Sequence, residues 1–260
     1  MTKKKKITVL IIGIILIIAV CFKGEALFSR FSDSRSLWYF SGDTEKKIQD
    51  LKSVPEDALK DYDSLMVVAH PDDETIWGGS HLENGKYVVV CITNGTNSTR
   101  RKEFANVMKQ TGSIGLMLTY PDKTNGERDN WDSCKEQIQK DIDTIVSKKN
   151  WATIATHNPD GEYGHIHHQM TSAITTQAVE QQKLTDHLYY FGIYVKAKNM
   201  EKENYQTYLE NPLTSDDLES KLCLTKLYAS QAKVMDHLGH MLPYENWIPA
   251  SEYASTAFLK

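Results

Sequence analysis

The chain has 260 residues, of which 40% are hydrophobic and 25% are charged, and its formal net charge is −4. This length allows one ordinary α/β domain with a sizeable core, plus a short additional segment. The composition excludes a largely disordered chain, and the acidic balance argues against a nucleic-acid-binding protein.

The amino terminus predicts a membrane anchor. Residues 1–6 form a basic tail with four lysines, and the 16 residues 7–22 (ITVLIIGIILIIAVCF) contain no charged side chain. Sixteen helical residues span about 24 Å, slightly less than a hydrocarbon core of about 30 Å, and the lysines on both flanks can cover the difference. A cleaved signal peptide is the main alternative, and a buried core helix is disfavoured by the adjoining lysines.

The basic tail also predicts an orientation. Lysines next to a membrane helix remain in the cytoplasm, so the rest of the chain is expected on the other side. Without the four lysines of the tail, the remaining chain has a formal charge of −8. We therefore expect a single-pass protein of the cell membrane, with an extracytoplasmic domain that binds no nucleic acid.

Beyond the anchor, residues 23–60 are expected to form a juxtamembrane connector with a short helical stretch at residues 44–51, followed by one domain over residues 61–260. Apolar runs predict five strands, at residues 65–69, 86–93, 114–120, 152–156 and 187–195. Helical spacing of apolar residues predicts helices at 100–110, 132–148, 165–182 and 215–238. This alternation indicates an α/β fold, Rossmann-like, with a mainly parallel sheet and helices on both faces.

Polar motifs follow two of the predicted strands. AHPDDE (residues 69–74) comes directly after the first strand, and HNPDGEYGHIHH (residues 157–168) follows the fourth. The carboxyl ends of parallel strands form the active-site edge of such a sheet. Imidazoles and carboxylates are the usual ligands of catalytic zinc, and a further carboxylate can accept a proton from the bound water.

The His-Pro-Asp-Asp sequence has a geometric consequence. Pro71 keeps His70 extended, so the chain turns sharply after it and the carboxylates of Asp72 and Asp73 cannot point the same way. One can then bind metal while the other faces the bound water. Alone, this motif could be a turn with an Asp N-cap, and a lone H-x-x-H could be a solvated helix face. Both motifs at two strand ends of one sheet favour a metal site.

The sequence resembles the PIG-L / LmbE-like zinc-dependent de-N-acetylases over about residues 61–193. The family signature A-H-P-D-D-E is intact at residues 69–74, and a T-H-N-P-x-G-E-Y stretch followed by G-H-x-x-H is matched at residues 156–168. The R-x-x-E and Pro-Asp motifs of the family are matched by Arg100 with Glu103 and by Pro121 with Asp122.

The resemblance implies a hydrolase that uses Zn²⁺ to remove the acetyl group from an N-acetylglucosamine-type sugar. It implies that the zinc ligands are His70, Asp73 and His168. It implies Asp72 as the general base, and His165 as the group that stabilises the oxyanion or acts as a general acid. The residues that would contact the sugar are Arg100, Asp122 and Tyr163. For an enzyme that faces outward, the substrate is expected to be a cell-envelope glycan.

One position departs from the family pattern. Many bacterial members have Asp immediately before the last histidine, where this chain has His167. On a regular helix His165 and His168 share a face, whereas His167 points away by about 160°. This geometry favours His168 over His167 as a ligand.

Two alternative functions remain open at this stage. The chain could be an inactive carbohydrate-binding protein on the same fold, or a zinc hydrolase that cleaves another acyl bond, such as an ester. All the catalytic positions of the family are filled, which favours an active enzyme.

Overall fold

A computed structural model describes residues 36–206 and 208–253. The anchor predicted at residues 7–22 lies outside these residues. Within the described part of the chain, none of the helices is both long and apolar enough to cross a bilayer.

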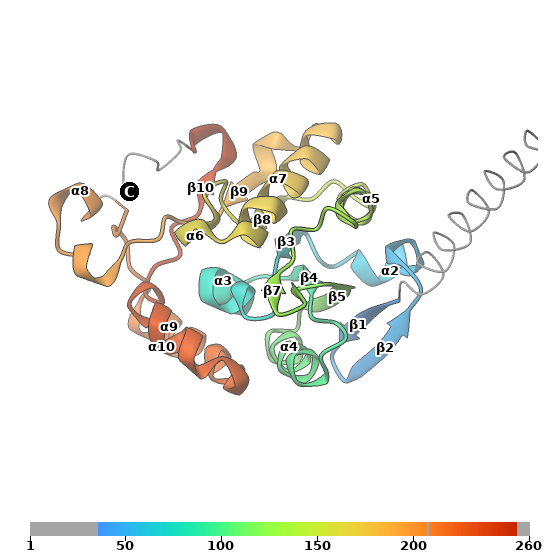
Figure 1. Ribbon diagram of the computed structural model, residues 1–260, viewed down its shortest axis with the longest axis horizontal. Coiled ribbons are helices and arrows are strands. Elements are labelled where there is room, and N and C mark those ends of the chain that lie inside the picture. Colours follow the sequence, from blue (N-terminus) through green and yellow to red (C-terminus); the bar gives the residue numbers. More distant parts are fainter. Residues whose placement is uncertain (1–35, 207, 254–260) are drawn as a thin grey trace, which may run out of the picture. The chain divides into compact units, whose positions relative to one another are not determined.

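The described residues contain an eight-stranded sheet with the order β10-β9-β8-β3-β4-β5-β1-β2 (Figure 1). Its five central strands are parallel: β3 (Ser64–Val68), β4 (Tyr87–Thr93), β5 (Ile114–Tyr120), β8 (Thr153–Thr156) and β9 (Leu188–Tyr190). The predicted α/β fold with a mainly parallel sheet is confirmed for this domain. The last strand is shorter than expected, because its parallel pairing with β8 ends at Tyr190.

The sheet is extended by antiparallel strands at both edges. These are β1 (Leu37–Ser41), β2 (Thr44–Ile48) and β10 (Ile248–Pro249). The connector expected at residues 23–60 is therefore incorrect over residues 37–48, where the chain forms a hairpin. Of the helical stretch expected at residues 44–51, residues 44–48 form a strand instead. The sequence gives little sign of β2, because four of its five residues are exposed and no apolar alternation marks it.

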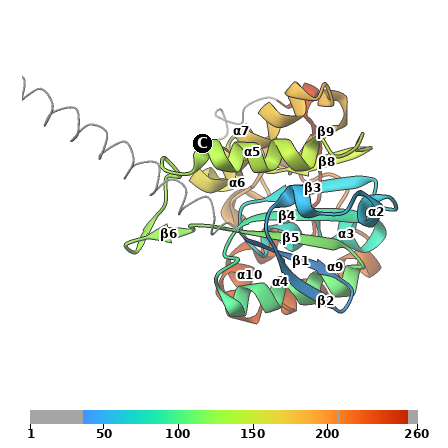
Figure 2. The ribbon, with the colours of Figure 1, turned by 90° about the vertical axis from the view of Figure 1, so that its right-hand side faces the viewer.

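Helices cover both faces of the sheet, α5 (Lys135–Val146) and α7 (Ile166–Gln181) on one face and α3 (Asp73–Asn84) and α4 (Ser98–Thr111) on the other (Figure 2). Successive residues of β3 alternate between these layers. Leu65 packs into the apolar cluster of α5 and α7, whereas Met66 packs into the cluster of α3 and α4. A strand buried on both faces has the continuous apolar sequence seen here.

Two longer helices lie in the carboxyl-terminal part, α9 (Ser215–Lys226), which packs against α3, and α10 (Ala232–Leu238). The helical character expected over residues 215–238 is confirmed, with a short break between the two helices. The shorter elements are α2 (Glu56–Leu59), β6 (Lys123–Thr124), β7 (Glu127–Arg128), α6 (Gly161–Gly164) and α8 (Glu203–Gln206).

The connections bring the ends of β3 and β8 side by side. From β3 the chain passes through α3 to β4, which pairs with one side of β3, whereas β8 pairs with the other side. At such a reversal of strand order, the two loops that follow the strands diverge and leave a crevice at their carboxyl ends. The two polar motifs therefore meet there, as the sequence predicts.

A buried ion pair joins α9 to the segment after α10. The Nζ atom of Lys221 lies 2.7 Å from Oε1 of Glu245, and at most 1% of either side chain is exposed. The same carboxylate accepts a hydrogen bond from the amide of Ser80 in α3, at 2.9 Å. Glu245 therefore ties three segments of the domain together.

Replacing this glutamate is expected to destabilise the domain. Glu245→Ala leaves the ammonium of Lys221 buried without a counter-charge, so the free energy of unfolding should fall by about 3–5 kcal/mol. Urea denaturation measures this change. The control, Glu219→Ala at an exposed position of α9, should stay within about 0.5 kcal/mol of wild type. Equal stability of the two variants would show that the buried pair does not stabilise the fold.

Candidate metal centre and active site

The turn after β3 separates two adjacent carboxylates. Asp72 has a φ of 128°, which is unfavourable for an L-residue. The first turn of α3 holds this conformation, because the carbonyl of Asp72 accepts hydrogen bonds from the amides of Thr75 (3.0 Å) and Ile76 (2.9 Å). As a result, the Asp72 side chain contacts Arg100, whereas the Asp73 side chain contacts histidines. The expected divergence of the two carboxylates is confirmed.

The Asp73 carboxylate lies among several imidazoles. Its Oδ2 is 3.2 Å from Nδ1 of His70, and its Oδ1 is 3.3 Å from Nε2 of His168. Burial opposes ionisation of Asp73, but His168 and His157 outweigh it and hold the pKa of this carboxyl well below its usual range. The three residues predicted as metal ligands are therefore brought together.

His168 is oriented by a carboxylate to which the sequence analysis assigned no role. Its Nδ1 lies 2.5 Å from Oε2 of Glu162. Its Nε2 is buried and has no partner with hydrogen-bond geometry among the described residues; Asp73 Oδ1 at 3.3 Å is an ion-pair contact. An imidazole whose Nδ1–H is bound to a carboxylate presents a lone pair at Nε2, as metal-binding histidines do.

His157 is the second supporting residue that received no role. Its ring stacks on His168 with centroids 3.8 Å apart, and its nitrogens lie 3.1 Å from Glu162 and 3.3 Å from Asp73. Burial lowers the pKa of His157, but these two carboxylates outweigh burial and raise it to about 9. His157 belongs to the T-H-N-P stretch, but its position in the sequence does not show whether it binds the metal or holds other side chains in place.

His165 lies beside the predicted ligands. Its ring centroid is 4.4 Å from that of His168 and 4.8 Å from that of His70. Burial and the neighbouring His168 lower the pKa of His165 to about 2, so this imidazole is neutral at pH 7. Its Nδ1 accepts the amide hydrogen of His167 at 3.2 Å, which leaves the proton on Nε2. His165 is therefore suited to donate a hydrogen bond from Nε2.

Asp72 carries the properties of an acid–base group. Burial and the charge of Asp73 raise the pKa of Asp72 to about 7, although Arg100 opposes the rise. Nη2 of Arg100 lies 3.3 Å from Oδ2 of Asp72, and Nη1 lies 3.4 Å from Glu103. Arg100, predicted to contact the sugar, is only 6% exposed and holds the Asp72 carboxylate instead. Its contact with substrate remains a prediction.

The other two residues predicted to contact substrate lie at the rim. Asp122 follows β5, and its Oδ1 is 3.3 Å from Nε2 of His70 and also contacts Arg128. Tyr163 is 44% exposed, and its ring centroid is 5.6 Å from that of His168. The contact of these two residues with the sugar remains a prediction.

The expectation that His167 points away from the site is incorrect. His165 is the N-cap of α7 and has an extended backbone (φ −72°, ψ 121°), so a helical wheel that includes it does not apply. The side chain of His167 is buried, and its Nδ1 lies 3.0 Å from Nε2 of His70. Ile166, which is 43% exposed, is the residue that faces outward here.

Within the described residues, three groups of side chains have ligand atoms close enough to share one metal ion. They are His70–His165–His168, Asp73–His157–His168 and His70–Asp122–His167, and the ligand atoms within each group lie within 4.8 Å of one another. The predicted ligands combine members of the first two groups, which share His168.

The carboxyl-terminal part of the domain also supports the site. The hydroxyl of Tyr228 donates a 2.5 Å hydrogen bond to Glu74, whose other oxygen accepts from the amide of Asp72 at 3.0 Å. Burial raises the pKa of Glu74 to about 8. This contact spans 154 positions of the sequence, so no local motif could indicate it.

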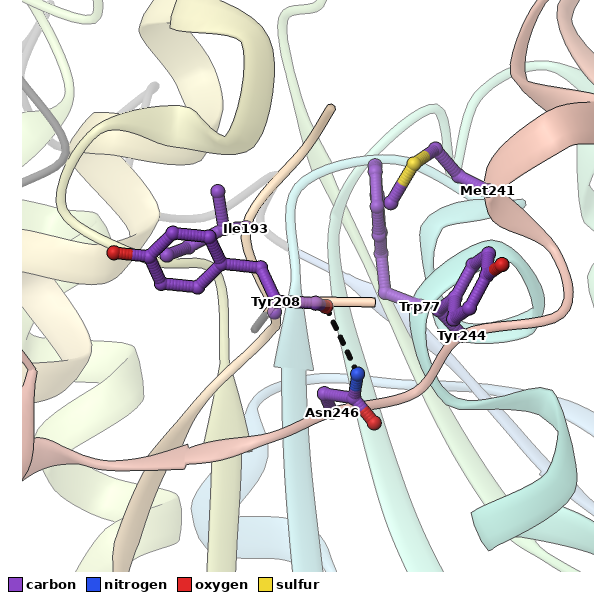
Figure 3. Close-up of a pocket in the computed structure, with 7 residues that line it drawn as sticks. Trp77, Ile193, Tyr208, Met241, Tyr244 and Asn246 are labelled. Carbon is purple, nitrogen blue, oxygen red and sulfur yellow. Dashed lines mark hydrogen bonds between the residues drawn. The ribbon is translucent and has the colours of Figure 1, made fainter. Parts of the chain in front are cut away.

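A separate cavity lies where the residues after β9 meet the carboxyl-terminal segment. Figure 3 shows its lining, in which Nδ2 of Asn246 donates a 3.0 Å hydrogen bond to the carbonyl of Tyr208. Its other lining residues are Trp77, Gly192, Ile193, Met241 and Tyr244. None of the eight predicted site residues lines it, so the candidate chemistry lies outside this cavity.

Comparison with known proteins identifies the domain. Residues 65–179 match the family described as PIG-L: GlcNAc-PI de-N-acetylase. An uncharacterized protein of Acanthamoeba polyphaga mimivirus is 34% identical over 129 residues, which cover 43% of this chain and 56% of the viral protein. The matched family segment begins in β3 and ends in α7, and it contains the entire histidine and carboxylate cluster. The segment that carries this cluster, residues 65–179, therefore matches the PIG-L family.

Proposed function

We propose that this protein is a zinc-dependent hydrolase that removes the acetyl group from an N-acetylglucosamine-type sugar, in a glycan of the cell envelope. One observation carries the proposal. His70, Asp73 and His168 direct ligand atoms toward one another beside the buried carboxylate of Asp72. This combination suits metal-assisted hydrolysis of an amide, and the family supplies the class of amide.

The chemistry of the three donors fits zinc. The buried Nε2 of His168 has no hydrogen-bond partner among the described residues, and a bound cation would satisfy it. Two imidazoles and one carboxylate are a ligand set of catalytic zinc. The carboxylate of Asp73 reaches both histidines, with Oδ2 at 3.2 Å from Nδ1 of His70 and Oδ1 at 3.3 Å from Nε2 of His168, so the three side chains are close enough to share one ion.

When bound, zinc supplies a Lewis acid that polarises the amide carbonyl and lowers the pKa of water at the site. Asp72 accepts the proton of the attacking water, because its carboxylate lies beside the predicted ligands and contacts Arg100 instead of the histidines, and a bound cation would favour its ionised form. Arg100 keeps this carboxylate in place. The Nε2–H of His165 donates a hydrogen bond to the oxyanion as it forms.

The reaction ends when the carbon–nitrogen bond breaks and Asp72 returns the proton to the leaving nitrogen. The products are acetate and a free amino sugar. Acetate release from a panel of N- and O-acetylated sugars and envelope glycans tests this assignment. Release from N-acetylated sugars supports it. Release only from O-acetylated sugars would favour an esterase, and no release by zinc-loaded protein would favour a binding protein.

The ligand set predicts a specific loss of metal. His70→Ala, Asp73→Ala and His168→Ala should each lose the one zinc ion expected per chain, because two remaining ligands do not hold zinc at a catalytic site. His237→Ala, at an exposed histidine of α10, is the matched control and should keep the ion. Mass spectrometry of the metal content decides, and zinc retained at full stoichiometry by the His70 variant would refute the ligand set.

The role of Asp72 as general base predicts that its replacement reduces activity without loss of zinc. Asp72→Asn should bind zinc normally and reduce kcat by ~10²-fold or more, because the amide cannot accept the proton. Asp186→Asn, at an exposed position, should leave kcat unchanged. Metal content and acetate release are measured on the same samples. Near-native turnover in Asp72→Asn would remove Asp72 from the mechanism.

We further propose that residues 7–22 anchor the domain on the outer side of the cell membrane. The support is the uncharged run behind four lysines. Protease added to intact cells stripped of their wall should then digest the domain. Complete protection until the cells are lysed would place the domain in the cytoplasm, and envelope glycans would no longer be reachable substrates.

A further inference from the structure

His167 occupies a fixed position between a backbone carbonyl and the predicted ligand His70. Its Nε2 lies 2.7 Å from the carbonyl oxygen of Asp129, and its Nδ1 lies 3.0 Å from Nε2 of His70. The side chain is fully buried, so it cannot exchange these partners for water. Neither the predicted ligand set nor the proposed mechanism uses it.

The surroundings of His167 hold its ring rigidly. Trp131 stacks on the imidazole with centroids 4.3 Å apart and an interplanar angle of 12°. The indole Nε1 of Trp131 donates a 2.8 Å hydrogen bond to the carbonyl of Pro121, and its amide donates to the side chain of Asp129 at 2.7 Å. The carbonyl that faces His167 is therefore itself held in place.

This geometry determines where the protons lie. A carbonyl oxygen only accepts hydrogen bonds, so Nε2 of His167 carries the hydrogen that points to Asp129, and Nδ1 is an acceptor. His70 must then donate from its Nε2. Asp122, whose Oδ1 lies 3.3 Å from the same nitrogen, is a second acceptor that requires the same proton. Nη1 of Arg128 lies 3.4 Å from the same nitrogen, at the outer limit of hydrogen-bond distance, and lies closer to Asp122.

The consequence concerns the other nitrogen of His70. Without metal, Nδ1 of His70 shares a proton with the Asp73 carboxylate 3.2 Å away; a metal ion would replace that proton, and with a proton fixed on Nε2 it would meet the lone pair of Nδ1. We propose that His167 is a positioning residue, which fixes the tautomer and ring orientation of His70 so that Nδ1 is the atom that binds the metal. This inference rests on the proposed metal site. Metal-binding histidines usually donate their other N–H to a carboxylate or a carbonyl. Here the imidazole of His167, held by the carbonyl of Asp129, accepts that hydrogen bond from His70.

Two variants of similar size separate this role from simple packing. In His167→Asn the side-chain oxygen can occupy the place of Nδ1 and accept from His70, whereas His167→Leu fills a similar volume with no acceptor. Zinc affinity, measured by chelator competition on the full chain, should fall by about 10–100-fold in His167→Leu, within the range for lost outer-shell partners. His167→Asn should remain within about threefold of wild type, because the bond to His70 is kept.

Nitrogen-15 NMR of the zinc-loaded wild-type protein provides a readout that needs no variant. His70 should show a metal-bound Nδ1 and a protonated Nε2. Metal binding through Nε2 of His70, or equal zinc affinities for the Asn and Leu variants, would overturn the inference. Both measurements are made without substrate. Zinc binding without acetate release would therefore refute only the proposed reaction, whereas a wild-type protein that binds no zinc would refute both proposals.

Discussion

The buried negative charge of Asp73 is the constraint on which the rest of the site depends. A carboxylate that is 4% exposed is costly to bury unless positive or hydrogen-donating groups surround it. Here the backbone amide of His70 donates at 2.8 Å, and the imidazoles of His157 and His168 complete the surroundings. These groups come from the end of β3, the end of β8 and the first turn of α7, and the pairing of β3 with β8 brings them together around the Asp73 charge.

The same turn gives two neighbouring carboxylates opposite properties. The pKa of Asp73 is well below its usual range because of the histidines, whereas burial and the charge of Asp73 raise the pKa of Asp72 to about 7. Asp73 therefore stays charged and can bind a metal ion, whereas Asp72 can exchange a proton. Two carboxylates with different pKa values allow one site to combine metal binding with acid–base chemistry. The positive φ of Asp72 makes this difference possible, since it directs the Asp72 side chain toward Arg100 and away from the histidines that surround Asp73.

The sequence predicted the central strands and the meeting of the two motifs, because continuous apolar runs and polar strand ends are local signals. It did not predict the support around the motifs. Glu74 and Tyr228 are 154 positions apart, and the pairing of Glu162 with His168 depends on a positive φ of 56° at Glu162. The orientation of His167 was missed because the histidine before Ile166 is a cap and not part of the helix. Distant contacts and irregular backbone leave no periodic pattern in a sequence.

The central claim is that one zinc ion binds where these side chains converge, and anomalous diffraction at the zinc edge from crystals grown with zinc tests it most directly. The account predicts one strong peak, about 2.0–2.2 Å from Nδ1 of His70, a carboxylate oxygen of Asp73 and Nε2 of His168. A peak between His70, Asp122 and His167, or no peak within reach of His168, would contradict it.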